Sequence, residues 1–303
     1  MKKKILITGA SGMLGKSLIR IINKKNINLL TPSSKKLDLL DKNSIDKYLK
    51  KNKPNYVIHL AGYIGGIEAN INEPVNFLQE NILMGINLVK SCCAFKIKNF
   101  LNIGSSCIYP TNFKHALKEE KLFDGKVETT NEGYAIAKIA VIKICEYVSK
   151  ELKFNYFSLI PCNIYGPHDK FDLGKAKVIP ALINKIFRSK HKIEVWGDGK
   201  DIKDFIYVED FIDATLKIIT KQNKIFDIFN ISQGNSITLN KVIMCLKKIT
   251  NKKNLIIKYN KTKPTMIPIR KISSKKINKM WKPKHSLLSG LTKTYDWYSK
   301  QNS

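Results

Sequence analysis

Arginine and acidic residues are scarce in this chain of 303 residues. Three of the 54 basic side chains are arginines (Arg20, Arg188 and Arg270), only 24 residues are acidic, and the net charge is +30. Proteins that read bases or clamp phosphates usually favour arginine, whose planar guanidinium forms two parallel hydrogen bonds. Because the charge is carried by lysines spread along the chain, we expect no nucleic-acid binding. A basic surface would still attract small anions such as nucleotide sugars.

Cysteines and histidines form no metal-binding or disulfide pattern. The six cysteines include no CxxC pair and the five histidines no HxxxH pair, which argues against a bound metal or a disulfide framework. No apolar run is long enough to span a bilayer. Gly9 and Gly12 interrupt the apolar segment that follows the basic N-terminus, so this segment does not read as a signal peptide. We therefore expect a metal-free cytoplasmic protein with no membrane segment.

A strand, a glycine-rich turn and a helix open the chain. Residues 4–8 are an apolar β-type run, and three glycines follow with GxxGxxG spacing before a helix with one apolar face. In a dinucleotide-binding fingerprint the first glycine permits the tight turn. The second lets backbone approach the pyrophosphate, and the third lets helix and strand pack closely. We expect the cofactor to contact Gly9, Ser11, Gly12, Met13, Leu14 and Gly15.

The end of the second expected strand, residues 28–30, indicates which dinucleotide binds. NAD-binding proteins usually have an acidic residue here for the ribose 2′-hydroxyl, whereas this chain has Ser33, Ser34 and Lys35. Hydroxyl groups and a lysine suit a 2′-phosphate, so we predict NADP(H). Asp38 and Leu39 follow in the chain and are candidates for contacts with the adenine end of the cofactor.

Strands and helices alternate up to about residue 166, which predicts an α/β fold with a Rossmann-type doubly wound parallel sheet. Further strands are expected at 55–60, 99–103 and 156–160, and helices at 76–93 and 130–152. Ligands of such sheets lie beyond the carboxyl ends of the strands, so the residues that follow these strands should meet in one crevice. The additional cofactor candidates there are Leu60, Ala61, Gly62, Pro161, Asn163 and Ile164.

Two interleaved domains are expected. Residues 1–166 form the cofactor domain, and residues 167–303, where the alternation weakens, form a smaller substrate-binding α/β domain. Segments at about 205–231 have the apolar pattern of core elements and are expected to return to the first domain.

Tyr134 and Lys138 lie four residues apart in the expected helix 130–152, so their side chains share one face. The ammonium group should lower the phenol's pKa from about 10 and prepare it to protonate a carbonyl that receives a hydride. Most such pairs are ordinary helix surface, and the spacing alone is weak evidence. The glycine fingerprint and the sequence Gly-Ser-Ser-Cys at 104–107 strengthen it.

Together, GxxGxxG, SSCIYP, YAIAK and NIYGPHD resemble the extended short-chain dehydrogenase/reductases, and within them the GDP-L-fucose synthases, over nearly the whole chain. The resemblance implies that Ser105 hydrogen-bonds a C4 carbonyl, Tyr134 protonates it, and Lys138 holds the nicotinamide ribose. Cys107 matches the family's epimerisation base, for which a thiolate is chemically suited. The alternative is that this cysteine is a small buried apolar residue.

The chain departs from that family at the epimerisation acid. The family has a histidine directly before VIPAL, and Lys177 stands at this position. An ammonium with a pKa of about 10.4 is a poorer proton donor at neutral pH than an imidazolium. The resemblance then implies an NADPH-dependent reductase of the C4 ketone of a GDP-linked 4-keto-6-deoxy sugar, hexose or heptose, with little epimerisation. The alternatives are a complete GDP-L-fucose synthase and a catalytically silent NADP-binding regulator.

The resemblance also implies a substrate site and a homodimer. Lys185 stands where the family has a basic residue for the pyrophosphate, and Trp196 is expected to stack on the guanine. Helices 76–93 and 130–152 are apolar on more than one face, so two copies should pair through them. The further substrate candidates are Ser106, Cys107, Asn163, Lys177, Val178, Lys203 and Lys271.

Overall fold

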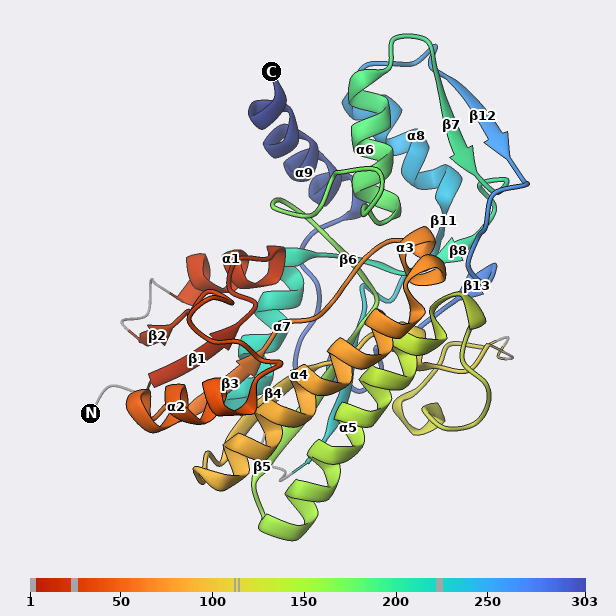
Figure 1. The fold of residues 1–303 in the computed structure, drawn as a ribbon. Helices are drawn as coiled ribbons and strands as arrows, with labels where there is room; N and C mark the ends of the chain where they lie inside the picture. The colour runs from red at the N-terminus through yellow and green to blue at the C-terminus, as the bar shows by residue number, and fades with distance from the viewer. Residues whose placement is uncertain (1–3, 23–26, 112, 114, 222–225) are drawn as a thin grey trace.

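A six-stranded parallel sheet forms the centre of the protein, in the order β10-β5-β4-β3-β1-β2 (Figure 1). The computed structural model describes residues 4–22, 27–111, 113, 115–221 and 226–303. The strand order reverses between β1 and β3, where doubly wound sheets open their ligand crevice. The predicted fold class is therefore confirmed. The strands are β1 (Lys4–Thr8), β2 (Asn28–Leu30), β3 (Tyr56–His59), β4 (Asn99–Ile103), β5 (Asn155–Pro161) and β10 (Ile228–Ile231).

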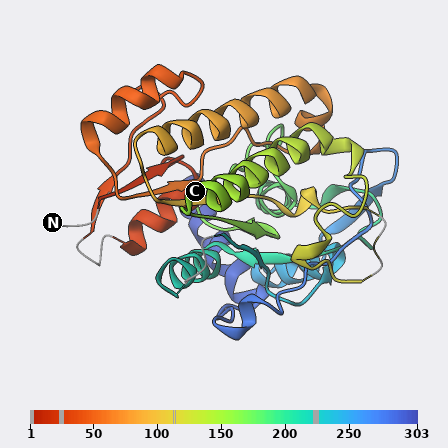
Figure 2. The same ribbon diagram turned by 90° about the horizontal axis from the view of Figure 1, so that it is seen from below.

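Helices cover both faces of this sheet (Figure 2). Because both faces are covered, β1 and β4 are buried along nearly their whole length and are mostly apolar. The buried Asn102 of β4 is an exception, and its amide nitrogen donates a hydrogen bond to Ser158 Oγ at 3.2 Å. Asp41 begins one helix as its N-cap, since its carboxylate accepts the backbone N–H of Asn43 at 2.8 Å. One face carries α2 (Lys42–Asn52), α4 (Pro74–Ala94) and α5 (Glu132–Leu152), and the other carries α1 (Met13–Ile22) and α7 (Val208–Lys221).

Helices α4 and α5 lie side by side (Figure 1). A Cβ atom at Gly85 of α4 would lie only 2.3 Å from the side chain of Val141 of α5, so the glycine allows the close approach. Helix α5 begins two residues later than predicted because residues 129–131 form a 3₁₀ turn. This packing determines where the N-terminal turns of α5, with Tyr134 and Lys138, lie relative to the strand ends.

The described residues from 163 onward form short strands and four helices, one of which is α7. The strand pairs are β6–β9, β7–β12 and β8 with both β11 and β13. A short helix, α3 (Ile67–Asn72), precedes α4 in the first half of the chain. Besides α7 and β10, the elements after residue 162 are β6 (Asn163–Tyr165), α6 (Val178–Arg188), β7 (Lys192–Trp196), β8 (Ile202–Lys203), β9 (Phe205–Tyr207), β11 (Ile237–Thr238), α8 (Leu239–Ile249), β12 (Ile256–Asn260), β13 (Ile269–Arg270) and α9 (Leu287–Asn302).

Part of this region returns to the main sheet. Strand β10 pairs with β5 in the register Phe229↔Leu159, and α7 packs against α1. One hydrophobic core continues from Ile7 of β1 through Phe211 of α7 to Ile183 of α6. The described part of the segment at 205–231 thus contributes β10 to the main sheet and α7 to its cover. None of the described helices combines the length and the apolarity that a membrane crossing requires.

Candidate functional site

The glycine turn after β1 has the packing of a phosphate-binding turn. Gly9 has φ +67°, and a Cβ on it would lie 2.6 Å from the backbone nitrogen of Ala61. A Cβ on Gly15 would lie 2.5 Å from the Cα of Ala10, so both glycines are needed by the fold itself. Gly12 differs, because its nearest neighbour would be the Gly9 carbonyl oxygen at 3.5 Å. The space over Gly12 is therefore open to a ligand at the N-terminus of α1, whose first turn carries no acidic residue.

A buried hydrogen bond fixes the next strand end beside this turn. Thr8 Oγ1 lies 2.8 Å from His59 Nδ1 and also accepts the N–H of Ala61 at 3.4 Å. Burial, with a further contribution from the charge of Lys138, lowers the pKa of His59 to about 3, so the ring is neutral. Sequence reasoning missed Thr8 and His59, because their side chains meet only when β1 and β3 pair.

The residues predicted for the 2′-phosphate lie exposed after β2. The carbonyl of Ser33 accepts the backbone N–H groups of Lys36 and Leu37, which closes a turn and leaves the side chains of Ser33, Ser34 and Lys35 at the surface. Asp38 accepts the N–H of Leu40 at 2.9 Å, so its carboxylate is engaged within its own loop. Leu39 is buried.

Lys138 is buried, and its Nζ lies 5.5 Å from the centroid of the Tyr134 ring. Burial lowers the pKa of Lys138 to about 8; Cys107 opposes this shift and the charge of Lys177 adds to it. The pKa of Tyr134 is raised, first by burial and then by Cys107. The expectation that Lys138 lowers this pKa is wrong for this structure, because loss of hydration outweighs the nearby cation. The phenol stays protonated and keeps a proton to donate.

The loop after β3 lies against Lys138. A Cβ on Gly62 would lie 3.1 Å from Asn81 Oδ1 and 3.5 Å from Lys138 Nζ. The amide of Asn81 holds this loop, because it accepts the N–H of Tyr63 at 3.1 Å and donates to the Tyr63 carbonyl at 3.0 Å. Asn81 on α4 therefore positions the backbone next to the buried ammonium group.

Ser105, Ser106 and Cys107 form a tight turn at the end of β4. Ser105 caps the 3₁₀ turn 106–108 by accepting the N–H of Cys107 at 3.5 Å. Burial raises the pKa of the Cys107 thiol, against the opposing effects of Ser105, Arg270 and Lys138. Cys107 is therefore a thiol at neutral pH and is not activated as a base. It is near enough to Tyr134 and Lys138 to influence the pKa of each.

Arg270 and Glu128 support this turn through buried hydrogen bonds, and neither residue was predicted from the sequence. Arg270 Nη1 donates to the carbonyl of Ser106 at 2.7 Å, and Nη2 lies 3.2 Å from a carboxylate oxygen of Glu128. Both side chains are almost fully buried, at 6% and 5% exposure. The one sequence signal for Arg270 was the scarcity of arginine. In a chain whose other basic residues are nearly all lysines, an arginine indicates a position where two planar hydrogen bonds are needed.

Lys177 is the N-cap residue of α6 and is exposed. The segment before it packs on the loop after β3, since Lys170 Nζ donates to the Ile64 carbonyl at 3.2 Å. Lys177 is near enough to Lys138 and to Asp169 to influence the pKa of each. The structure therefore brings Lys177 to the group formed by Ser105, Cys107, Tyr134 and Lys138.

Two other predicted substrate residues already donate hydrogen bonds to backbone carbonyls. The amide nitrogen of Asn163 donates to the Asp204 carbonyl at 2.9 Å, and Lys185 Nζ donates to the Glu194 carbonyl at 2.9 Å. Trp196 ends β7, with Lys263 Nζ 5.4 Å from its ring. The remaining positions are Leu60, Met13 and Leu14, which are partly buried, Pro161 and Ile164, which are buried, Ser11 and Val178, which are exposed, Lys203, which ends β8, and Lys271, which follows β13.

Comparisons with known proteins extend over the whole chain. The GDP-L-colitose synthase of Yersinia pseudotuberculosis is 41% identical over 99% of both chains. The GDP-L-fucose synthase of Sinorhizobium fredii is 37% identical and covers 97% of this chain and 95% of its own. The resemblance proposed from the motifs is thereby confirmed.

Solved structures are also similar to this chain over nearly its whole length. A GDP-6-OMe-4-keto-L-xylo-heptose reductase from C. jejuni superposes with a TM-score of 0.91 at 26% identity, covering 99% of both chains. A GDP-mannoheptose C4 reductase from Campylobacter jejuni, solved with NADP bound, has a TM-score of 0.87 at 28% identity and 98% coverage of both chains. The model of the NAD dependent epimerase/dehydratase family matches residues 5–232. Because this model matches residues 5–232 and a relative is 41% identical over 99% of the chain, the chain belongs to the NAD dependent epimerase/dehydratase family.

Proposed function

We propose that this protein is an NADPH-dependent oxidoreductase that reduces the C4 ketone of a GDP-linked 4-keto-6-deoxy sugar for surface-glycan biosynthesis. The observation that carries the proposal is the gathering of Ser105, Tyr134 and buried Lys138 at the end of β4, next to the loop after β3. Relatives named for GDP-sugar synthesis and GDP-sugar C4 reduction support the substrate class. We place this biosynthetic enzyme in the cytoplasm.

The residues present fit NADP(H), because the space over Gly12 is open and Ser33, Ser34 and Lys35 are free at the surface. When bound, NADPH supplies a hydride. The Ser105 hydroxyl donates a hydrogen bond to the ketone oxygen. Tyr134 is partly buried, and the raised pKa of its phenol keeps it protonated, so that it gives that oxygen its proton as negative charge develops. Lys138 would hold the nicotinamide ribose, and its positive charge stabilises the phenolate that remains when Tyr134 gives up its proton. In this proposal, residues 1–166 hold the cofactor and 167–303 mainly the sugar nucleotide.

Product identification tests the proposal directly. Purified protein is incubated with NADPH and a panel of GDP-4-keto-6-deoxy hexoses and heptoses, and products are identified by mass spectrometry and NMR. We expect NADPH oxidation with formation of a C4 alcohol on at least one of them. Binding of NADPH without oxidation on every member of the panel would favour a silent NADP-binding protein instead.

NADPH should be strongly preferred over NADH. No carboxylate is available at the end of β2 for a 2′-hydroxyl, and Lys35 is exposed there. Lys35→Ala should lower the ratio of kcat/KM values for NADPH and NADH about fivefold to tenfold, the scale of one solvent-exposed hydrogen bond. Lys36→Ala, the exposed neighbouring lysine, is the matched control and should leave the ratio unchanged. Equal affinity of the wild type for both cofactors would contradict the reading of this loop.

Reduction should proceed with little exchange of hydrogen at C3 or C5. Exposed Lys177 stands at the expected acid position and Cys107 is a buried thiol, so a paired acid and base are missing. In D2O without NADPH, the wild type should incorporate little deuterium into the 4-keto sugar, and Lys177→His should increase incorporation. Cys107→Ser should keep reduction of a suitable substrate within about tenfold, since Ser105, Tyr134 and Lys138 carry that step.

The complete epimerase–reductase is the rival of this proposal. Rapid deuterium incorporation by the wild type that disappears in Cys107→Ser would establish the rival, whatever the effect of Lys177→His.

We also propose a homodimer that pairs α4 and α5. Their outer faces leave Leu83, Ile136 and Tyr147 exposed at 37%, 44% and 56%. Sedimentation should show a dimer at micromolar concentration, and Ile136→Asp should shift it toward monomer. Ile256→Asp, at an exposed isoleucine of β12, should not. A monomeric wild type at these concentrations would be evidence against the pairing.

A further inference from the structure

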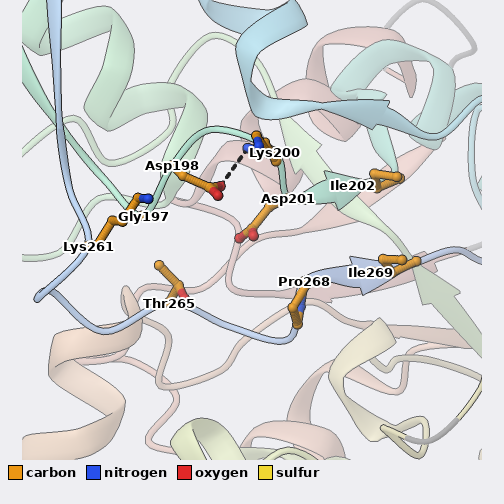
Figure 3. Close-up of a pocket in the computed structure, with 9 residues that line it drawn as sticks. All are labelled: Gly197, Asp198, Lys200, Asp201, Ile202, Lys261, Thr265, Pro268 and Ile269. Carbon is orange, nitrogen blue, oxygen red and sulfur yellow. Dashed lines mark hydrogen bonds between the residues drawn. The ribbon is translucent and has the colours of Figure 1, made fainter.

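Cavities at two places in the protein are large enough to hold part of a sugar nucleotide. A cavity of about 390 Å³, lined by Asp201 and Thr265 among others, directly follows Trp196, the residue expected to stack on the guanine (Figure 3). A smaller cavity of about 250 Å³ lies at the N-terminus of α5, between α3, the first turn of α4 and residues 129–134. Whole small-molecule sites usually measure roughly 300–1,000 Å³. The smaller cavity is therefore suited to one edge of a ligand.

The smaller cavity borders the proposed proton donor. Tyr134 and Phe77 both line it, and their rings pack edge-on with centroids 6.2 Å apart. A Cβ on Gly133 would lie 2.8 Å from the carbonyl oxygen of Pro74, so the first turns of α4 and α5 are in close contact. The cavity is thus held between two packed helix ends, with one wall formed by the residue that is proposed to protonate the C4 oxygen.

Two asparagine side chains of this cavity have an oxygen atom without a hydrogen-bond partner among the described residues. Asn70 on α3 and Asn131 before α5 both line the cavity, are 9% and 8% exposed, and have a buried, unpartnered Oδ1. The amide nitrogen of Asn70 donates to the Gly66 carbonyl at 2.8 Å, which determines that its oxygen is the free end. Asn131 is the N-cap residue of α5, yet its side chain caps no backbone N–H. Buried acceptors are normally paired, so the two oxygens indicate a ligand that donates hydrogen bonds.

The substrate of the proposed function has two such donors close to C4. A group that enters this cavity while C4 lies at Tyr134 must be attached to a ring carbon near C4. In a 4-keto-6-deoxy hexose, C5 carries a methyl group, which donates no hydrogen bond. C2 and C3 carry hydroxyl groups on the other side of the ring. Two hydroxyl donors match the two amide oxygens in number and in chemistry.

We propose that this cavity binds the edge of the sugar ring that carries the C2 and C3 hydroxyls, and that Asn70 and Asn131 accept hydrogen bonds from them. This inference rests on the proposed function and narrows its substrate class to sugars that have a hydroxyl at C3. A site built to hydrogen-bond a hydroxyl rejects the analogue that lacks it, because its buried acceptors then stay unpaired. Asn131 is therefore a specificity-determining residue.

Binding of two sugar nucleotides to the enzyme loaded with NADP⁺ tests the assignment, because no hydride is then available for reduction. Dissociation constants are measured by calorimetry for GDP-linked 4-keto-6-deoxymannose and for its 3-deoxy analogue. The wild type should bind the 3-hydroxy sugar about tenfold or more tightly, the scale of one hydrogen bond whose loss leaves a buried acceptor unpaired. In Asn131→Leu, which has a similar volume and no oxygen, the ratio of the two constants should fall toward one.

Asn184→Leu is the matched control. Asn184 on α6 is also buried and also has an unpartnered Oδ1, but it is not among the residues that line this cavity. Its replacement should leave the ratio at the wild-type value. Circular dichroism verifies that each variant is folded, and Asn131→Ala repeats the test if leucine disturbs the start of α5.

A wild-type ratio near one, or an unchanged ratio in a folded Asn131 variant, would overturn the assignment. Reduction of both sugars by NADPH in that case would leave the proposed function intact. Conversely, preferential binding of the 3-hydroxy sugar without any reduction would remove the function and keep the hydroxyl site.

Discussion

Replacing Tyr134 by phenylalanine should lower kcat at least about a hundredfold, the scale of general acid catalysis, with NADPH affinity nearly unchanged. The substitution removes the hydroxyl but keeps the ring, which packs edge-on against Phe77 at a centroid distance of 6.2 Å. The fold and the neighbouring Lys138 should therefore be preserved. The measurements are steady-state kcat with the sugar nucleotide identified from the panel, and NADPH binding by fluorescence.

Tyr147→Phe is the matched control for this change. Tyr147 lies on the same helix but is 56% exposed, so loss of its hydroxyl should leave kcat within about twofold. Wild-type turnover by Tyr134→Phe would remove Tyr134 from the mechanism. A large loss in both variants would point to a general effect on α5 rather than to proton transfer.

Replacing Arg270 by methionine should destabilise the protein by about 3–5 kcal/mol, the cost of breaking a buried ion pair from one side. The carboxylate of Glu128 would stay buried without its partner, and the carbonyl of Ser106 would lose its donor. Because Ser106 lies between Ser105 and Cys107, kcat should fall as well. Urea denaturation followed by circular dichroism measures the first effect, and kinetics at saturating substrate measure the second.

Two further variants sharpen this test. Lys121→Met breaks the exposed ion pair with Asp124 and should leave the urea midpoint nearly unchanged. Adding Glu128→Met to Arg270→Met removes the stranded carboxylate, and stability should recover in part. Activity should not recover, because the Ser106 carbonyl still lacks its donor. A loss of less than about 1 kcal/mol in Arg270→Met would show that the pair is unimportant for the turn.

Local features of this protein were predictable from sequence. Each depends on residues close together in the chain: the GxxGxxG turn after an apolar strand, the Asp41 helix start, and the four-residue spacing of Tyr134 and Lys138. Alternation of strands and helices also predicted the parallel sheet, because burial on both faces requires continuous apolar strands. The missing acidic residue after β2 pointed to NADP(H) for the same local reason.

Contacts between segments that are distant in the sequence could be identified only from the tertiary structure. Arg270 reaches Ser106 across 164 positions, and Glu128 joins them from a third segment. The spacing of Tyr134 and Lys138 predicted a lowered phenol pKa, yet burial raises it, because the cost of removing a charge from water depends on everything packed around it. Likewise, the orientations of two nearby carboxylates are set only by folding. The Asp201 side chain points into a cavity (Figure 3), whereas Asp198 accepts a hydrogen bond from Lys200 in its own loop. Sequence patterns record which face a residue shares with its near neighbours, whereas desolvation and long-range hydrogen bonds exist only once the elements have packed.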